Sequence, residues 1–215
     1  MHNYHPSKKD KQLSLLIPGK LLASGLTINQ KYILGLNFSL KEKFGYNSYS
    51  HKEVGKMVNL HPNIVGSARK ALVEQRLLLK NGRKYTLTHK ALEFSEDDKG
   101  QVVLPFDLYS LSNVNTGAKL LWGVYNFISR GFRDYFALRE TTAARINVSV
   151  GSITNWTKEL DQKRLLKMYE HRNGYCTSQT VVVTCSFIKG KPDLVLNREK
   201  DHLGNWRPIM PLFDL

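Results

Sequence analysis

The chain has 215 residues, of which 41% are hydrophobic, and its formal net charge is +14. That apolar content is ordinary for a folded globular protein, and no apolar run is long enough to cross a bilayer. The charge surplus favours a polyanionic partner, with nucleic acid ahead of an anionic membrane. We therefore expect a nucleic-acid partner and no membrane association.

The cysteines and the N-terminus bear on the compartment. Cys176 and Cys185 lie in one extended segment, where strand alternation places them on opposite faces and disfavours a disulfide. They also lack the nearby histidine pair of a structural zinc site. Residues 1–10 are polar and lack the apolar stretch of a signal peptide. We expect a cytoplasmic protein with reduced cysteines and no bound metal.

The sequence repeats itself at a distance of 88 residues, because residues 31–78 align with residues 119–166 without a gap. A period of this length predicts two copies of one domain and not a solenoid, because each copy has room for its own core. Nine of the 48 aligned positions are identical, and they pair Lys31 with Lys119, Gly35 with Gly123, Phe44 with Phe132, Asn59 with Asn147, Lys70 with Lys158, Leu72 with Leu160, Arg76 with Arg164, Leu77 with Leu165 and Leu78 with Leu166.

Charge and polar composition place the domain boundaries. Residues 1–95 hold 16 Lys and Arg against 5 Asp and Glu, whereas residues 116–186 hold 10 against 5, so the first copy should dominate phosphate contact. The polar cluster at residues 95–100 is typical of a linker. We expect an N-terminal domain over 1–95, a linker and leading strand over 96–115, a C-terminal domain over 116–186 and an extended tail over 187–215 that packs on the body of the protein.

The first copy begins with two predicted helices. The apolar spacing over residues 28–43 is typical of an amphipathic helix, with Thr27 as a candidate N-cap. Ser50 and Glu53 form a capping-box pattern at the start of a short helix that ends before Asn59.

A third helix and a hairpin complete the first copy. Pro62 suits a first helical turn, and Val65, Ala68 and Leu72 share the inward face of the helix that follows over residues 63–75. The Asn-Gly pair at residues 81–82, between two apolar arms, predicts a hairpin with a type I′ turn.

The second copy independently predicts the same order of elements. Helices are expected over residues 117–129, 138–146 and 150–163, followed by a hairpin around Asn173 and Gly174. The stripe positions of its third helix are occupied by Ile153, Trp156 and Leu160. The fold class is therefore mainly α with small β-hairpins, an α+β protein.

Three segments resemble the prokaryotic winged helix-turn-helix modules of phage and plasmid replication proteins, of the replisome-organiser and replication-initiator type. They are Leu104-Pro105-Phe106-Asp107-Leu108, the helix start at residues 117–122, and the helix end at residues 156–166. The first copy carries a weaker version at residues 17–21, 29–34 and 70–78. The resemblance covers roughly residues 16–186 and implies a tandem pair of modules that bind double-stranded DNA. Arg76 and Arg164 depart from the family pattern, which has an acidic or small residue there.

In a helix-turn-helix, the second helix of the motif enters the major groove, and its outward side chains contact base edges. Asn pairs with adenine, Lys reaches guanine or phosphate, and Ser serves either edge. Any surface helix of a basic protein carries such residues, so the assignment depends on the two aligned copies. The expected contacts from these helices are Asn63, Ser67, Arg69 and Lys70 in the first copy, and Ser152, Asn155 and Lys158 in the second.

The hairpins offer phosphate contacts through Lys80, Arg83 and Lys84 in the first copy and Arg172 in the second, although a solvated charged turn has the same composition. Gln12-Leu13-Ser14-Leu15-Leu16 is similar to the peptide by which replication proteins dock on the sliding clamp. The alternative is an ordinary strand that leads into the domain, since Leu15-Leu16-Ile17-Pro18 aligns with residues 102–105 of the second copy. A homodimer stays open as a further partner.

No phosphate loop, metal-ligand cluster or carboxylate pair indicates catalysis, so we expect neither catalytic residues nor a cofactor. The sequence predicts a sequence-specific DNA-binding protein, with a plasmid or phage replication initiator as the leading role. A transcription regulator with the same contacts is the first alternative. In the second alternative, the first copy binds DNA and the second copy is a protein-interaction module.

Overall fold

The computed structural model of the chain describes residues 13–96, 100–129, 134–173, 176–185, 187 and 197–209. The chain separates into two compact units, unit 1 (residues 1–119) and unit 2 (residues 120–215). The division falls within the helix Thr116–Ile128, downstream of the predicted linker over residues 96–115. Both units combine helices with small antiparallel sheets, so the fold class is α+β.

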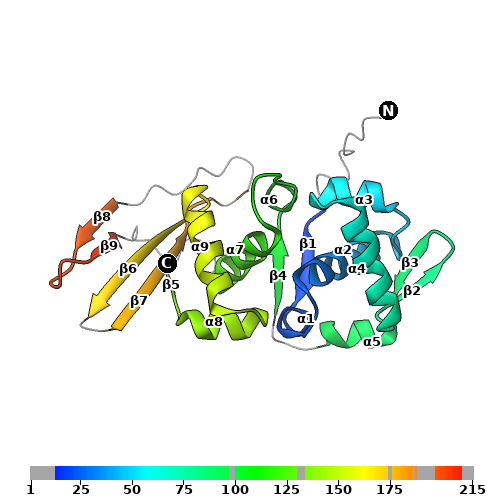
Figure 1. The fold of residues 1–215 in the computed structure, drawn as a ribbon, viewed down its shortest axis with the longest axis horizontal. Coiled ribbons are helices and arrows are strands. Elements are labelled where there is room, and N and C mark those ends of the chain that lie inside the picture. The colour runs from blue at the N-terminus through cyan, green and yellow to red at the C-terminus, as the bar shows by residue number, and fades with distance from the viewer. Residues whose placement is uncertain are drawn as a thin grey trace. The chain divides into compact units, whose positions relative to one another are not determined.

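Unit 1 is built on one central helix that is covered by two others and flanked by strands (Figure 1). Its elements are β1 (Leu15–Pro18), α1 (Gly19–Ala23), α2 (Ile28–Phe44), α3 (His51–Val58), α4 (Pro62–Glu74), β2 (Leu78–Asn81), β3 (Lys84–Leu87), α5 (His89–Leu92), the 3₁₀ turn η2 (Glu93–Ser95), β4 (Gln101–Leu104), α6 (Phe106–Tyr109) and the start of α7 (Thr116–Ile128).

The leading strands of the two predicted copies pair with each other inside unit 1. β1 and β4 run antiparallel, with Leu15 opposite Leu104 and Ile17 opposite Val102. All four side chains are buried. Their common burial follows from strand geometry, because alternate residues of a strand face the same side.

This pairing corrects the interpretation of Gln12–Leu16 as an exposed clamp-docking peptide. Gln12 lies outside the described residues, but Leu13 and Leu15 are both buried. The backbone of Leu16 donates a hydrogen bond of 2.9 Å to Ser39 Oγ. A docking peptide must present its apolar side chains to the partner, whereas these side chains belong to the core of unit 1.

Helix α2 is buried around its whole circumference over ten consecutive residues, 31–40. It begins at the predicted N-cap, where the Gln30 amide donates to Thr27 Oγ1 and the Thr27 amide donates to Gln30 Oε1. Gly35 allows the helix to approach β1, because a Cβ at this position would lie 2.8 Å from Ile17 Cγ1 and 2.9 Å from the Leu16 carbonyl oxygen.

The predicted capping box at the start of α3 is confirmed. The Glu53 amide donates to Ser50 Oγ, and the Ser50 amide donates 2.7 Å to Glu53 Oε2, which holds the pKa of that carboxyl below its ordinary value of 4.5. The helix ends at Asn59 in the left-handed conformation. The Leu60 amide then bonds the Gly55 carbonyl at 2.9 Å, and Pro62 opens α4 in its first turn.

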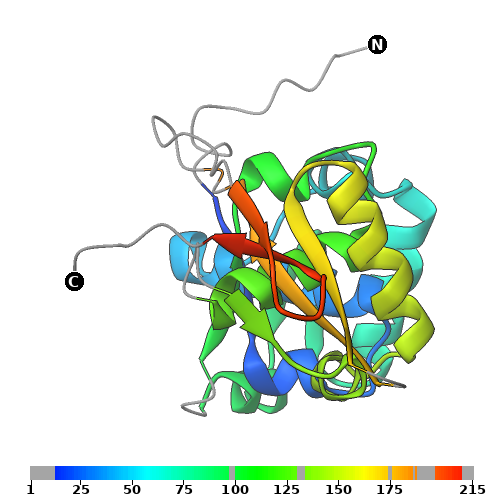
Figure 2. The ribbon, with the colours of Figure 1, turned by 90° about the vertical axis from the view of Figure 1, so that its left-hand side faces the viewer.

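Unit 2 repeats this arrangement after the remainder of α7 (Figure 2). Helices α8 (Arg139–Ile146) and α9 (Val150–Gln162) begin and end 88 residues after α3 and α4. The other elements of unit 2 are β5 (Asp134–Phe136), β6 (Leu166–Asn173), β7 (Cys176–Val183), β8 (Asn197–Lys200) and β9 (Trp206–Ile209).

Two of the identical positions in the repeat have the same unusual backbone. Asn59 and Asn147 have φ values of 53° and 55°, and Arg76 and Arg164 have φ values of 58° and 59°. Asn adopts the left-handed region readily, whereas Arg has no special preference for it. Asn59 and Arg76 lie on either side of α4, and Asn147 and Arg164 lie on either side of α9. Both units therefore begin and end this helix with the same turns.

The sheets of the two units differ in a way that the sequence did not predict. In unit 2, β5 adds a third strand in the order β5-β7-β6, with Tyr135 opposite Val181. In unit 1, the aligned residue Asn47 makes a single bridge to Tyr85, with amide-to-carbonyl bonds of 2.9 and 2.8 Å. The first copy therefore keeps only one residue pair of this strand.

Two further expectations are corrected. Trp156 is only half-buried, and Thr157 fills the buried position between Ile153 and Leu160. The tail is not simply an extended arm, because β8 and β9 form an antiparallel hairpin. Its turn is closed by Asp201, whose Oδ1 accepts the amides of Leu203 and Asn205 at 2.9 Å each.

We expect Gly35→Ala to lower the free energy of unfolding by about 1–3 kcal/mol, because the new methyl group overlaps the backbone of β1. Equilibrium unfolding in urea measures the change. Gly151→Ala is the matched control, since a Cβ there meets only Ser149 Oγ at 3.9 Å. In an open helical position, alanine replaces glycine without loss and stabilises by up to about 1 kcal/mol. Equal stabilities for both variants would contradict the proposed role of Gly35.

Candidate nucleic-acid interface

The outward face of α4 carries three of the predicted contacts, Asn63, Ser67 and Lys70, all of them exposed. The opposite face is buried through Val65, Ala68 and Leu72, as the 3.6-residue period requires. Lys70 Nζ lies 3.9 Å from Glu74 Oε1, and the lysine side chain is 80% exposed. An exposed pair of this kind is weak, so Lys70 remains able to contact a ligand.

Arg69 does not share this face, which corrects its prediction as one of the outward side chains that contact base edges. The residue is 1% exposed. Its Nη1 donates to the Tyr49 carbonyl at 2.9 Å, and its guanidinium lies 4.3 Å from the centre of the Tyr85 ring. The aligned Thr157 of unit 2 is also buried and lies 2.9 Å from the hydroxyl of Tyr125. This helix position therefore faces inward in both copies.

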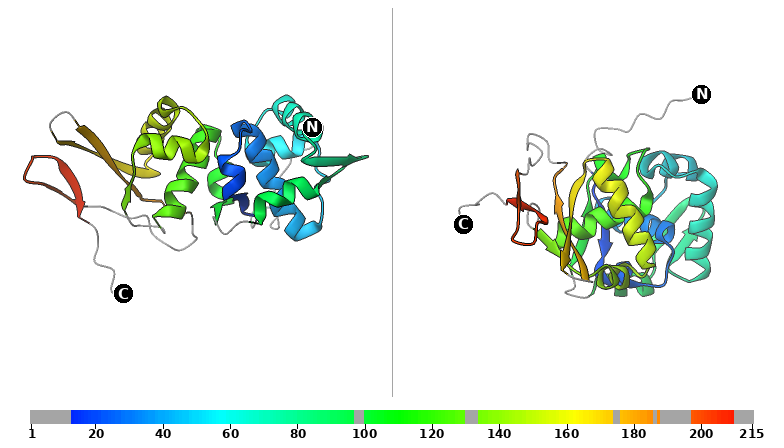
Figure 3. Two further views of the ribbon diagram at one scale, coloured as in Figure 1. Left: turned by 90° about the horizontal axis from the view of Figure 1, so that it is seen from below. Right: turned by 60° about the vertical axis from the view of Figure 1, so that its left-hand side comes forward.

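The β2–β3 hairpin extends from the helices of unit 1 and exposes Lys80, Arg83 and Lys84 (Figure 3). Its loop differs from the predicted one, because Asn81 pairs with Lys84 and leaves Gly82 and Arg83 as the two central residues. Gly82 has φ of 58° and Arg83 lies outside the left-handed region, which is typical of a type II′ turn and not of type I′. Lys84 Nζ lies 4.3 Å from the centre of the Tyr46 ring.

The corresponding face of unit 2 is less polar, and one of its side chains is already hydrogen-bonded within the protein. Asn155 and Lys158 on α9 are exposed, but Gly151 stands at the position of Asn63. Ser152 is half-buried, and its hydroxyl lies 2.9 Å from that of Ser149, the N-cap of α9. These side chains keep fewer free hydrogen-bonding groups than the face of α4.

Arg172 lies on β6 with an exposed side chain. Its backbone amide donates a hydrogen bond to Asn205 Oδ1, and its carbonyl accepts one from Asn205 Nδ2. This contact joins the β8–β9 hairpin to the β6–β7 hairpin.

The tail adds two cations that the sequence analysis missed, Arg198 and Lys200, which lie 4.3 and 5.3 Å from the centre of the Trp206 ring. The pairing of β8 with β9 brings these two cations to Trp206, and the sequence alone did not show that pairing.

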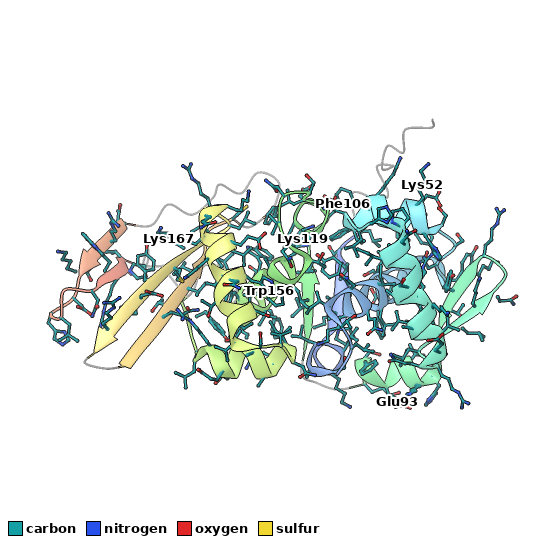
Figure 4. The ribbon with its side chains drawn as sticks, in the orientation of Figure 1. Lys52, Glu93, Phe106, Lys119, Trp156 and Lys167 are labelled. Carbon is teal, nitrogen blue, oxygen red and sulfur yellow. The ribbon has the colours of Figure 1, made fainter. Side chains whose placement is uncertain are left out.

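Some of the positive charge is structural and not available to a ligand. Lys119 is fully buried (Figure 4), and its Nζ donates to the carbonyls of Tyr109, the last residue of α6, and Leu111. Burial lowers the pKa of the aligned Lys31 to about 8. The net charge therefore overstates the charge that the surface presents.

The part of the chain that the structure describes holds no group of three or more His, Cys, Asp or Glu side chains suited to a metal ion. Among the same residues, no helix combines the length and the apolar character needed to traverse a membrane. No family model matches the sequence, and no curated protein matches it either.

The electrostatics of this surface can be measured at His51, at the start of α3. Its pKa lies below the ordinary value of 6.5 because the ring is partly buried and because Arg69 and Lys80 oppose its protonation. We expect Lys80→Gln to raise the pKa of His51, since one opposing charge is removed. Titration of the imidazole signals by NMR measures the shift, with Lys84→Gln as the control. An equal response to both substitutions would contradict this assignment.

Proposed function

We propose that the chain is a sequence-specific double-stranded DNA-binding protein made of two tandem winged helix-turn-helix modules. In unit 1, α2, α3 and α4 correspond to the three helices of such a module, and β2–β3 corresponds to the wing. In unit 2, the same roles fall to α7, α8, α9 and β6–β7. The order of elements and the shared offset of 88 residues support this assignment.

The observation that carries the proposal is the composition of the exposed face of α4. Asn63, Ser67 and Lys70 point outward from the helix that a helix-turn-helix inserts into the major groove. The exposed cations of the hairpin follow α4 in the chain, so unit 1 offers groups for base edges and for phosphates. Replication initiation by a plasmid or phage protein is the leading role, and transcription regulation uses the same contacts.

A second candidate function concerns unit 2 alone, as a protein-interaction module. Leu138 is 63% exposed beside the exposed Val150, at the starts of α8 and α9. Arg139 between them is paired with Glu170 at 3.0 Å and bonded to Gln179 at 2.9 Å, so its charge is largely compensated. An apolar surface with compensated charge suits a protein partner better than a phosphate backbone.

The first test of the proposal is DNA selection with the purified full-length chain, followed by affinity measurements over a salt series. We expect enrichment of a defined duplex site that spans two neighbouring groove segments, bound more tightly than random duplex at each salt concentration. The genomic position of the site, beside an origin or a promoter, separates replication from transcription. Binding that follows salt alone, with no enriched site, would refute sequence-specific recognition.

The aligned lysines test each unit separately. We expect Lys70→Ala to weaken binding to the selected site and to reduce the slope of log affinity against log salt by about 1, because one phosphate contact is lost. Lys158→Ala has the same effect if both units bind DNA and no effect if unit 2 binds protein. Fluorescence anisotropy measures both variants. The control is Lys41→Ala, an exposed lysine at the end of α2, and an equal loss there would show nonspecific charge attraction.

A further inference from the structure

Unit 1 contains an open cavity of about 700 Å³ where the starts of α3 and α4 meet the β2–β3 hairpin. We call it the Arg69 cavity. Its lining includes four cationic side chains, Lys52, Arg69, Lys80 and Arg83, and one carboxylate, Glu53. That carboxylate already accepts the Ser50 amide at 2.7 Å as part of the capping box. Figure 4 shows Lys52 on α3.

Arg69 gives the wall of this cavity a charge that no carboxylate in the described part of the chain neutralises. Its Nε and Nη2 have no hydrogen-bond partner among the described residues, and only Nη1 is bonded, to the Tyr49 carbonyl. Burial lowers its pKa to about 10, which leaves the guanidinium charged at neutral pH. A buried cation without a counterion is unfavourable by itself, so the fold retains it at a cost.

Other groups of the lining fit a bound anion. The Tyr85 hydroxyl lies 3.5 Å from His51 Nε2, and both side chains belong to the lining. Partial burial of the ring lowers the pKa of His51, and the nearby charges of Arg69 and Lys80 lower it further. A phosphate offers several strong acceptor oxygens, which match hydroxyl, imidazole and ammonium donors.

Unit 2 has a cavity at the corresponding place, and its chemistry is different. Leu138, Arg139, Glu140 and Val150 line it, 88 residues after Ser50, His51, Lys52 and Pro62. The charge at the position of Lys52 is thus reversed. Thr157 replaces Arg69, and Met168 replaces Lys80. The remaining cation of this lining is Arg139, which is paired with Glu170.

We propose that the Arg69 cavity is an anion site that holds one phosphate group and that the corresponding cavity of unit 2 holds none. Arg69 stabilises the anion from the wall, and the exposed Lys80 and Arg83 close on it from the hairpin. The proposal deepens the proposed DNA binding and rests on it for the source of the group, which is a phosphate of the duplex backbone. Such a contact fixes the position of α4 on the duplex without itself selecting a sequence.

The test is a titration of the full-length protein with inorganic phosphate at constant ionic strength, followed by NMR. We expect saturable shifts at His51 and Tyr85 and none around Arg139 and Val150. Arg69→Met should weaken phosphate binding about tenfold or more, and Lys80→Gln about threefold, because charge-assisted contacts are lost. Lys84→Gln is the matched control, since Lys84 lies on the same hairpin outside the lining, and it should change binding less than about twofold.

Thermal unfolding shows whether the Arg69→Met variant is folded. If that variant is unfolded, the Lys80→Gln variant still tests the proposal, because Lys80 is an exposed residue of the lining. Absence of saturation in the unchanged protein, or equal binding by the Lys80→Gln and Lys84→Gln variants, overturns the proposal. A short duplex that displaces inorganic phosphate from His51 identifies the backbone as the source. A duplex that binds without displacing it overturns that source and assigns the cavity to a free phosphate compound. Phosphate binding in a protein that selects no DNA site would support the cavity while refuting the proposed function.

Discussion

The geometry of unit 1 depends on two left-handed residues that bracket α4. Asn59 ends α3 with φ of 53°, which sets the direction of the chain before Pro62, and Arg76 has φ of 58° just before the hairpin begins. Residues between these turns must form a helix of fixed start and length, so the inward and outward positions of α4 are determined. Because Asn147 and Arg164 repeat both turns in unit 2, duplication has preserved this constraint even though the residues on the helix surfaces have diverged. Arginine offers no intrinsic advantage at the second turn, and nothing in the structure explains its presence at both copies.

The positive charge of the chain serves two different purposes. Lys119 is a structural cation, because it is buried and its ammonium group donates to the backbone carbonyls of Tyr109 and Leu111. Lys70 and the hairpin cations are exposed, and no strong partner among the described residues restricts their side chains. Arg69 belongs to neither group, since it is buried like the first and incompletely bonded. A net charge taken from the sequence does not distinguish these cases, because it contains no information about burial.

The sequence predicted the helices well where strong local signals coincide. Capping at Ser50, the proline at residue 62 and the apolar period place α3 and α4 to within about one residue, and the repeat transfers the same limits to α8 and α9. The two hairpins that follow α4 and α9 were predicted, but the pairing of β1 with β4 and of β5 with β7 was missed, because these pairs join segments distant in the sequence. β1 meets β4 across more than 80 residues, and β5 is only three residues long. Arg69 was misplaced for another reason, since charge suggested a surface position while the helical period placed it beside Ala68 and Leu72 on the buried face.

The two cavities differ in chemistry although the helices that form them begin and end at corresponding positions. The elements that form them begin at corresponding positions, so the space exists in both units for the same geometric reason. Exchange of Lys52 for Glu140 and of Arg69 for Thr157 removes the positive potential, and the exposed Leu138 adds apolar surface in its place. An anion gains from the first cavity because an uncompensated charge is already there, whereas it would have to displace Glu170 from Arg139 in the second. In the proposed phosphate binding, the difference in free energy between the two sites therefore comes from charge compensation within the protein.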